Sequence, residues 1–253
     1  MNSTSKPVLK IDWATHEAAK YACTNWHYSK SMPVGKMVKV GAWEDGKFIG
    51  VVIFSRGASP MLGMAYGLEQ IECCELTRVA LTKHKTPVSK LLAIAIKFLR
   101  KSNSELRLIV SFADTEQGHH GGIYQANGWA YSGQSAEKFD YIAPNGERLL
   151  SRQVANSGTV RQFGKVTKCF KRTDCIAVAV QGKHRYLMPL DDAMREQIAP
   201  LAKPYPKRTT RTKEQDTGYH PVLGGVTPTR ALQTCNQATL ETNGKTFTEV
   251  SNG

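Results

Sequence analysis

At two places in this chain, polar residues follow an apolar element and could take part in catalysis or binding. His27 and Tyr28 directly follow an apolar helical pattern, which places an imidazole beside a phenol in a loop. Asp114 ends an almost entirely apolar strand pattern, at the carboxyl end where α/β sheets place their sites. We therefore expect a functional role for Asp114. A plain surface helix end is the alternative interpretation of the His27-Tyr28 pair.

One pair of charged residues lies inside an apolar pattern. Glu75 and Arg78 stand on a predicted strand between apolar neighbours. Buried charges must be paired or used, because an isolated charge in an apolar interior is costly. A structural ion pair and a catalytic role are both open for these two residues.

A pair of histidines, His119 and His120, lies between glycines in a loop that lets imidazoles turn inward. Together with His27, Glu75 and Asp114 they supply enough imidazole and carboxylate ligands for a non-haem divalent metal such as Fe(II). The sequence therefore suggests a metal site. Histidines without a metal are the alternative.

The segment between a predicted strand and a predicted long helix is suited to an anion. Backbone amides and the positive end of the helix dipole meet at residues 84–89, where a phosphate or pyrophosphate can bind. Lys83 and Lys85 add positive charge, Thr86 can cap the helix, and Pro87 suits its first position. An ordinary strand-to-helix connection is the alternative.

The elements that must position these groups follow from hydrophobic periodicity and turn residues. Their order describes an α/β domain with one mixed sheet. The predicted elements are a helix over 15–26 capped by Thr15, a hairpin of strands 36–43 and 48–55 around Asp45-Gly46, strands over 71–82 and 106–114, a long helix over 83–101, and short helices over 123–127 and 190–202.

The short helix over 123–127 carries a motif. Tyr124, Gly128 and Trp129 form a Y-x-x-x-G-[FW] pattern after the long helix and the apolar strand. This order resembles the Gcn5-related N-acetyltransferase (GNAT) fold over about residues 10–135. The resemblance implies that acetyl-coenzyme A enters a gap between two splayed central strands and that Tyr124 protonates the leaving thiolate. The usual glycine-rich [QR]-x-x-G-x-[GA] pyrophosphate loop is replaced by KHKTPVS, which implies altered coenzyme A binding. The cofactor-binding residues implied by the resemblance are Val79, Ala80, Leu81, Lys83, Lys85, Thr86 and Ser89.

Four separated segments indicate one particular family with this fold. They are NWHYSKSMPVGK, CELTRVALTKHKTPVSKLLAIAI, VSFADTEQGHHGGIYQANGW and GKHRYLMPLDDAMREQIAPLAKPYPKR. Together they resemble the Mom DNA-modification proteins of Mu-like bacteriophages over about residues 10–208. The resemblance implies conversion of adenine in duplex DNA to N6-carbamoylmethyladenine, which blocks host restriction enzymes, with an acetyl-coenzyme A-type donor and in the host bacterial cytoplasm.

Within that family, the polar residues acquire expected roles. Tyr28 would stack on or hydrogen-bond a flipped adenine, and His27 would move a proton near pH 7. Asp114 would share their pocket and accept a hydrogen bond or a proton from the adenine amino group. The predicted catalytic set is His27, Tyr28, Glu75, Asp114 and Tyr124.

The charge of the chain favours a polyanionic partner. The 253 residues carry 34 Lys and Arg against 21 Asp and Glu, a net charge of +13. The stretch 148–185 holds nine basic residues and one acid, Asp174, with aromatic residues interleaved. We expect this stretch to contact duplex DNA, with a solvated basic sheet face as the alternative. The predicted DNA-contacting residues are Arg161, Lys165, Lys168, Lys171 and Arg172.

Domain organisation follows from composition. Residues 1–202 are predicted to form a GNAT-like catalytic domain, a mixed central sheet flanked by helices, whose basic portion spans about 136–202. Residues 203–253 lack a sustained apolar period and are predicted to form a flexible tail. No apolar stretch is long enough for a membrane span, and the six cysteines contain no C-x-x-C pair.

Two alternative functions remain open at the level of the sequence. One is a conventional N-acetyltransferase of a protein or small amine, and the other is a non-catalytic DNA-binding module.

Overall fold

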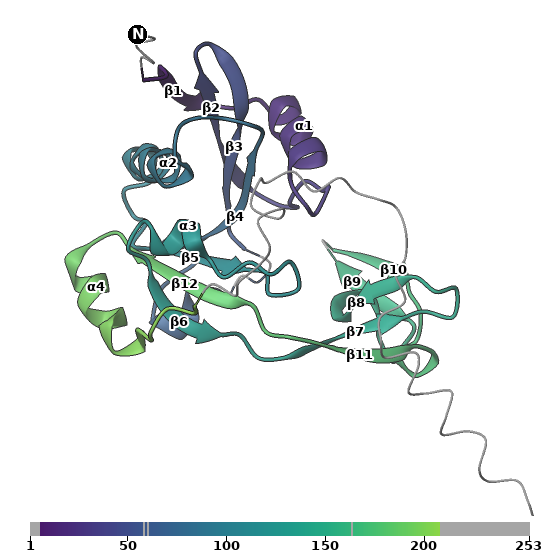
Figure 1. Ribbon diagram of the computed structural model, residues 1–253. Helices are drawn as coiled ribbons and strands as arrows, with labels where there is room; N and C mark the ends of the chain where they lie inside the picture. Colours follow the sequence, from purple (N-terminus) through teal and green to yellow (C-terminus); the bar gives the residue numbers. More distant parts are fainter. Residues whose placement is uncertain (1–5, 58, 60, 163, 208–253) are drawn as a thin grey trace, which may run out of the picture. The chain divides into compact units, whose positions relative to one another are not determined.

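The computed structural model describes residues 6–57, 59, 61–162 and 164–207, and its main feature is a seven-stranded sheet (Figure 1). The strand order is β1-β2-β3-β4-β5-β12-β6. β4 and β5 are parallel, and all other neighbours in this sheet are antiparallel. The predicted mixed α/β class is confirmed. The strands are β1 (Leu9–Trp13), β2 (Met37–Glu44), β3 (Lys47–Ser55), β4 (Cys73–Leu81), β5 (Leu108–Ala113), β6 (Ala130–Gln134) and β12 (His184–Pro189).

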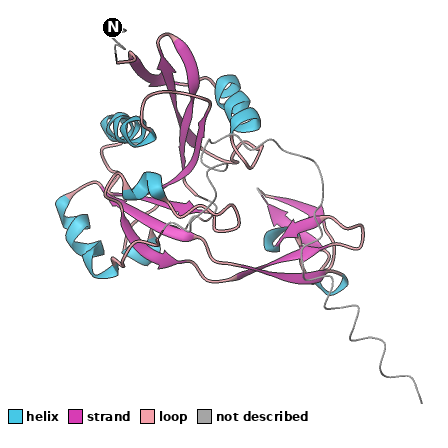
Figure 2. Ribbon diagram, in the orientation of Figure 1, coloured by secondary structure: helices cyan, strands magenta, loops and turns pink. Residues whose placement is uncertain are grey.

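Two helices cover opposite faces of the sheet (Figure 2). Successive residues of a strand point to opposite faces, and β3 follows this rule. Val51 and Ile53 pack in the cluster that contains Ala19, Ala22 and Cys23 of α1 (His16–Trp26). The alternate residues of β3, Val52 and Phe54, pack in the cluster that contains Leu92, Ala95, Ile96 and Leu99 of α2 (Val88–Ser102).

Local signals near the N-terminus are confirmed. Thr15 caps α1, because its hydroxyl accepts a hydrogen bond from the Ala18 amide at 3.2 Å. Asp45 and Gly46 connect β2 and β3 with φ values of 50° and 77°. These left-handed values are the ones that Asp and Gly tolerate in hairpin turns.

The strand β12 has no counterpart among the predicted elements, yet it lies between β5 and β6 in the sheet. Its Tyr186 is fully buried against the rings of Tyr124 and Tyr131. The predicted helix after it is present as α4 (Asp192–Ile198), capped by Asp191, which accepts from the Met194 amide at 2.7 Å. The C-terminal part of the predicted basic portion thus belongs to the large sheet.

The rest of the basic portion forms two small sheets. One has the order β11-β7-β8 and the other pairs β9 with β10. Tyr141, Ala143, Leu149 and Val154 form a small core of their own. The remaining elements are β7 (Lys138–Ile142), β8 (Arg148–Leu150), β9 (Thr159–Gln162), β10 (Lys165–Lys168), β11 (Ile176–Val180), α3 (Gly122–Gln125) and the 3-10 turns Met64–Tyr66, Ser151–Gln153, Arg172–Asp174 and Ala199–Leu201.

The predicted tail begins with residues that contact the sheet. The Lys203 amide donates to the Tyr131 carbonyl at 2.7 Å, and the Tyr205 hydroxyl donates to the Trp129 carbonyl at 2.8 Å. The remainder of that tail, residues 208–253, lies outside the described residues. Among the helices that the structure describes, none is long and apolar enough to cross a membrane.

Candidate active site

The two parallel strands part in the middle of the sheet. Their pairing runs from Cys73 opposite Leu108 to Leu76 opposite Ser111 and goes no further. Beyond that point β4 continues along β3 to Leu81, whereas β5 continues along β12. A gap therefore opens between the carboxyl ends of β4 and β5, as the resemblance to the acetyltransferase fold implied.

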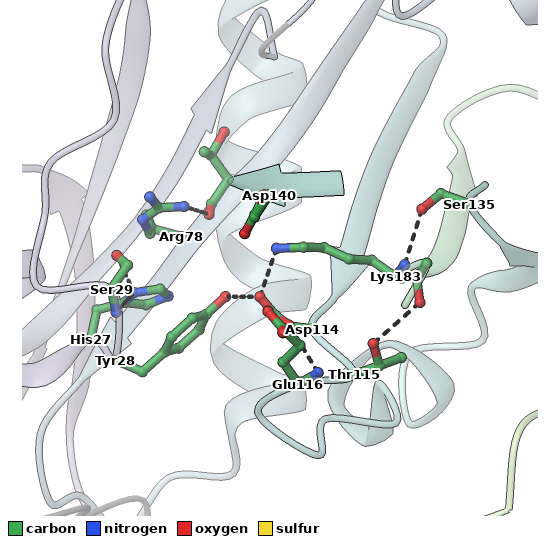
Figure 3. Close-up of polar contacts among 12 residues, drawn as sticks. His27, Tyr28, Ser29, Arg78, Asp114, Thr115, Glu116, Ser135, Asp140 and Lys183 are labelled. Atoms are coloured by element: carbon green, nitrogen blue, oxygen red, sulfur yellow. Dashed lines mark hydrogen bonds and ion pairs between the residues drawn. The ribbon is translucent and has the colours of Figure 1, made fainter. Parts of the chain in front are cut away.

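Asp114 stands directly after β5, at this opening, and is only 8% exposed. The Lys183 ammonium lies 2.6 Å from Asp114 Oδ2, and the Tyr28 hydroxyl donates to the same oxygen at 3.5 Å (Figure 3). The Glu116 amide donates to Oδ1 at 3.1 Å. The structure thus brings together the predicted Asp114 and Tyr28, which are 86 positions apart in sequence.

Lys183 is the site residue that sequence reasoning missed, because in the sequence it is one of many charges in a basic stretch. It is held by its neighbours: its amide donates to the Ser135 hydroxyl at 3.0 Å, and the Thr115 hydroxyl donates to the Gly182 carbonyl at 3.2 Å. A Cβ on Gly182 would lie 1.7 Å from the Ser135 carbonyl oxygen, so only glycine fits there. The Gly-Lys dipeptide at 182–183 was the available signal.

His27 is buried beside Tyr28, with the two ring centroids 4.3 Å apart. The Ser29 amide donates to His27 Nδ1 at 3.1 Å, and the Ser29 hydroxyl lies 2.8 Å from the same atom. Nδ1 is therefore an acceptor, and the ring proton of the neutral imidazole is on Nε2. Burial, followed by the nearby Arg78 charge, lowers the pKa of His27 to about 3. The imidazole is neutral near pH 7, which does not support the predicted proton transfer by His27.

Tyr28 presents a neutral phenol to the site. Burial of the hydroxyl, followed by the Asp114 carboxylate, raises its pKa to about 12. The residue remains 40% exposed, and its ring meets that of His119 edge-on with centroids 5.4 Å apart. A partly exposed aromatic face beside a carboxylate can accommodate a flat heterocycle.

Arg78 lies on β4 beyond its last pairing with β5, whereas Glu75 lies on the paired part, opposite Val110. Arg78 donates from Nη1 to the Thr77 carbonyl at 2.8 Å, whereas its buried Nε makes no hydrogen bond with the residues described. A buried hydrogen-bond donor without a protein partner can donate to an acceptor atom of a bound ligand. The charge of Glu75 contributes to the raised pKa of Tyr124 after burial, so these two side chains belong to the same environment.

Tyr124 lies where the strands part. The Ser111 hydroxyl lies 2.8 Å from the Tyr124 oxygen and 2.9 Å from the Leu76 carbonyl oxygen, and Leu76 and Ser111 are the last paired residues of β4 and β5. Burial raises the pKa of Tyr124 to about 12, so the phenol carries its proton at neutral pH. The donor role of Tyr124 that the resemblance implied stays a prediction.

The predicted metal site is not formed. Within residues 6–207, apart from the few undescribed positions, no group of three or more His, Cys, Asp or Glu side chains could hold a metal ion. Asp114 Oδ2 faces Lys183, and His27 Nδ1 faces Ser29. The His120 carbonyl accepts from the Tyr186 hydroxyl at 2.5 Å. His27, Glu75, Asp114, His119 and His120 are therefore not assembled as ligands.

The turn before α2 differs from the prediction. Glu44, a buried residue at the end of β2, accepts hydrogen bonds from the amides of Lys85 and Thr86, both at 2.8 Å. The Thr86 hydroxyl also donates to this carboxylate, at 2.7 Å. Thr86 therefore does not cap α2, whose N-cap is Pro87 without a side-chain hydrogen bond. The hydroxyl is engaged by a stronger, charged acceptor.

The remaining residues assigned to a coenzyme surround this turn. Val79, Ala80 and Leu81 pair with β3, and along the described strands their other edge has no strand partner. Lys83 and Lys85 flank the turn, and Ser89 is half-buried. The open strand edge fits an extended acyl-bearing arm. The Lys85 and Thr86 amides of this turn are not open to a pyrophosphate, because the Glu44 carboxylate accepts from both.

The basic residues of the basic portion fall into two groups: some bond to other residues of the protein, and others are exposed. Arg148 bonds to Asp140 at 3.0 Å and to Glu116 at 2.9 Å, and the Arg172 guanidinium lies 5.5 Å from the Tyr141 ring centroid. These charges support the fold. The exposed basic residues on or next to β9 and β10 are Arg161, Lys165, Lys168 and Lys171.

Comparison with known proteins decides the family. The model of the Mom protein family matches residues 8–207. The chain belongs to the Mom protein family. Among curated proteins, no sequence match reaches significance for this Mom-family chain.

Solved structures that resemble the Mom-family chain include three enzymes. An acetyltransferase from Bacillus subtilis, in complex with CoA, has 12% identity and a TM-score of 0.38 over 74% of this chain and 100% of its own. The IAA acetyltransferase from Bacillus cereus has 14% identity and a TM-score of 0.39 over 72% and 100%. FeeM, an N-acyl amino acid synthase from uncultured soil microbes, has 12% identity and a TM-score of 0.42 over 78% and 97%. The fold class of the Mom-family chain rests on its own sheet order.

Proposed function

We propose that this Mom-family protein converts adenine in duplex phage DNA to N6-carbamoylmethyladenine and so protects that DNA from host restriction. The observation that carries the proposal is the meeting of Asp114, Tyr28 and Lys183 where β4 and β5 part. Bond formation at an exocyclic amine requires an acceptor for a proton of that amine. Asp114 is the acceptor at this opening, and Lys183 holds its carboxylate in place.

Tyr28 would receive the base. Enzymes that modify a base inside a duplex extrude it and stack it against aromatic side chains. The Tyr28 ring is partly exposed and supported by His27 and by His119. An adenine on this ring would bring its amino group toward Asp114, because the Tyr28 hydroxyl already points at that carboxylate (Figure 3).

Arg78 and Tyr124 supply two further donors near the gap. Arg78 Nε is buried without a hydrogen bond to the described residues, and the Tyr124 phenol is protonated at neutral pH. Preorganised donors of this kind stabilise negative charge that develops on an acyl oxygen or a leaving group. Their placement supports an activated two-carbon acyl donor in the gap. Acetyl-coenzyme A is the donor that the family resemblance implies. Joining its methyl carbon to adenine N6 breaks a C–H and an N–H bond and requires a two-electron oxidant, and a nitrogen donor such as ammonia must replace the thiol of coenzyme A at the carbonyl.

The exposed basic residues of β9 and β10 would bind the DNA backbone. Arg161, Lys165 and Lys168 are exposed on a two-stranded ribbon whose register pairs Val166 with Arg161. Phosphate contacts by Lys and Arg supply most of the affinity of proteins for DNA and make it salt-dependent. This surface therefore favours DNA over a small amine as substrate.

The experiment that tests the function is nucleoside analysis. DNA from cells that express the full chain is digested enzymatically and its nucleosides are identified by mass. We expect a carbamoylmethylated deoxyadenosine, absent from cells that express Asp114→Asn. Soluble, folded protein with unmodified nucleosides contradicts the proposal. Acetylation of a protein or amine in the same cells would point instead to a conventional N-acetyltransferase.

The DNA-binding surface is tested separately by salt dependence. Replacement of Arg161, Lys165, Lys168 and Lys171 by Ala should reduce the slope of log affinity against log salt by about 0.9 for each phosphate that the variant no longer neutralises. The matched control removes four charges of α2, at Lys90, Lys97, Arg100 and Lys101. Equal slopes for the two variants would show that the β9–β10 surface is only a solvated face.

A further inference from the structure

Glu44 places a carboxylate inside the turn that joins β4 to α2. Its two oxygens accept three hydrogen bonds from Lys85 and Thr86, at 2.7 to 2.8 Å. The side chain arrives there because β2, β3 and β4 are adjacent antiparallel strands, so the end of β2 and the end of β4 meet at one edge. Glu44 is 8% exposed.

This arrangement has the chemistry of an anion site with its anion supplied by the protein. Two consecutive amides of the turn that precedes α2, together with a hydroxyl, are donors that suit a phosphate oxygen. The Thr86 hydroxyl, followed by the Lys85 and Thr86 amides, lowers the pKa of Glu44 despite its burial, so the carboxylate is ionised at neutral pH. The next residue, Pro87, has no amide hydrogen to offer.

We propose that Glu44 is a specificity-determining residue that excludes a diphosphate from this turn. A diphosphate on the amides of Lys85 and Thr86 would have to displace Glu44 or lie against its negative charge, and both are unfavourable. The donor of the reaction, whose existence rests on the proposed function, is then recognised through its acyl-bearing arm in the gap between β4 and β5. It draws no affinity from a diphosphate at the turn.

Direct binding measurements on the purified full chain test this inference. The probes are coenzyme A and pantetheine, which lacks the diphosphate and the nucleotide. We expect the wild-type protein to bind the two within about threefold of each other, and a protein that binds neither contradicts recognition through the arm. A tenfold or greater preference for coenzyme A in the wild type overturns the proposal.

Variants of Glu44 sharpen the test. Glu44→Ala removes the internal anion and should raise the preference for coenzyme A over pantetheine to tenfold or more, whereas the exposed control Glu105→Ala should leave the preference unchanged. A folded Glu44→Ala protein without that gain overturns the proposal. If this variant does not fold, the wild-type comparison decides alone.

Nucleoside analysis of the same cells separates this inference from the proposed function. Modified adenine together with no coenzyme A preference supports both. Unmodified adenine with no preference contradicts the proposed function and leaves the exclusion of diphosphate by Glu44 supported. Modified adenine with a strong coenzyme A preference in the wild type overturns only the role of Glu44.

Discussion

Two carboxylates stand at the carboxyl ends of strands, Glu44 on β2 and Asp114 after β5, and their surroundings differ. Glu44 is satisfied by the amides and hydroxyl of one short turn, Lys85–Thr86. Asp114 accepts from one local amide, that of Glu116, but its other oxygen meets the Lys183 and Tyr28 side chains, which come from segments 69 and 86 positions away. A carboxylate bonded to fixed backbone donors has little freedom to exchange partners. A carboxylate bonded to side chains, one of which is 42% exposed, can exchange one of them for a substrate.

The turn at residues 84–89 is the site that local sequence signals suggest, whereas the polar side chains gather at the loop after β5. Residues 84–89 resemble an anion site because strand-to-helix turns expose amides, and in the structure the Glu44 carboxylate accepts from two of them, those of Lys85 and Thr86. The loop after β5 has no such regular pattern, and it collects the polar groups. Donor geometry alone therefore does not identify a ligand site, since the protein itself can be the ligand.

The largest effect is expected for Asp114→Asn, which keeps the shape of the side chain and removes its proton-accepting charge. Adenine modification, measured by nucleoside mass analysis, should fall about a hundredfold or more. Folding and DNA affinity should change little, because phosphate contacts dominate the affinity. The control is Glu116→Gln, which alters a carboxylate two residues away. Near-normal modification by Asp114→Asn would make Asp114 as structural as Glu44.

For Glu44→Ala the expected loss is in stability. Two amides of the turn before α2 are left without their partner, and an unsatisfied buried donor costs about 1–3 kcal/mol in the free energy of unfolding. Denaturant unfolding measures this loss. A variant as stable as the wild type would show that water replaces the carboxylate at no cost and would remove the contrast with Asp114.

The pH dependence of stability gives an independent measure of Glu44. Its folded pKa lies below the ordinary 4.5. Its contribution is therefore present above pH 4.5 and is lost as the pH falls through the lower folded value. Glu44→Gln should lose less stability than the wild type on acidification through this window. Parallel curves for the two proteins would contradict the assignment.

A smaller effect is expected for Tyr28→Phe. The hydroxyl lies 3.5 Å from Asp114 Oδ2, which makes a weak hydrogen bond, whereas the ring that would stack on the base is retained. Modification should fall about tenfold, or about 1.4 kcal/mol in the barrier. Tyr28→Ala, which removes the ring as well, should fall further. Equal activities of the two variants would show that the ring does not contact the base.

The smallest effect concerns His27. Its pKa of about 3 keeps the imidazole neutral throughout the range in which activity is measured. Since a group with a lowered pKa gains its proton only in acid, His27 contributes no inflection near pH 6.5. The pH profiles of modification by the wild type and by His27→Gln should have the same shape between about pH 6 and pH 8. A wild-type inflection that disappears in His27→Gln would restore the predicted proton transfer.

The sequence by itself determined the elements whose signals are local. The cap of α1, the Asp45-Gly46 hairpin, the apolar face of α2 and the apolar run of β5 depend on neighbouring residues, so periodicity and turn chemistry predicted them. Four separated segments indicated the Mom family, which the family comparison confirms. The position of Asp114 at a strand end indicated where a site would be.

Only the tertiary structure decided which side chains meet. Lys183 reaches Asp114 because β12 lies between β5 and β6, and Glu44 reaches the turn before α2 because β2 and β4, on either side of β3, end at the same edge of the sheet. These contacts depend on the order of strands in the sheet. Strand order joins segments far apart in sequence, and no local pattern in either segment encodes the other.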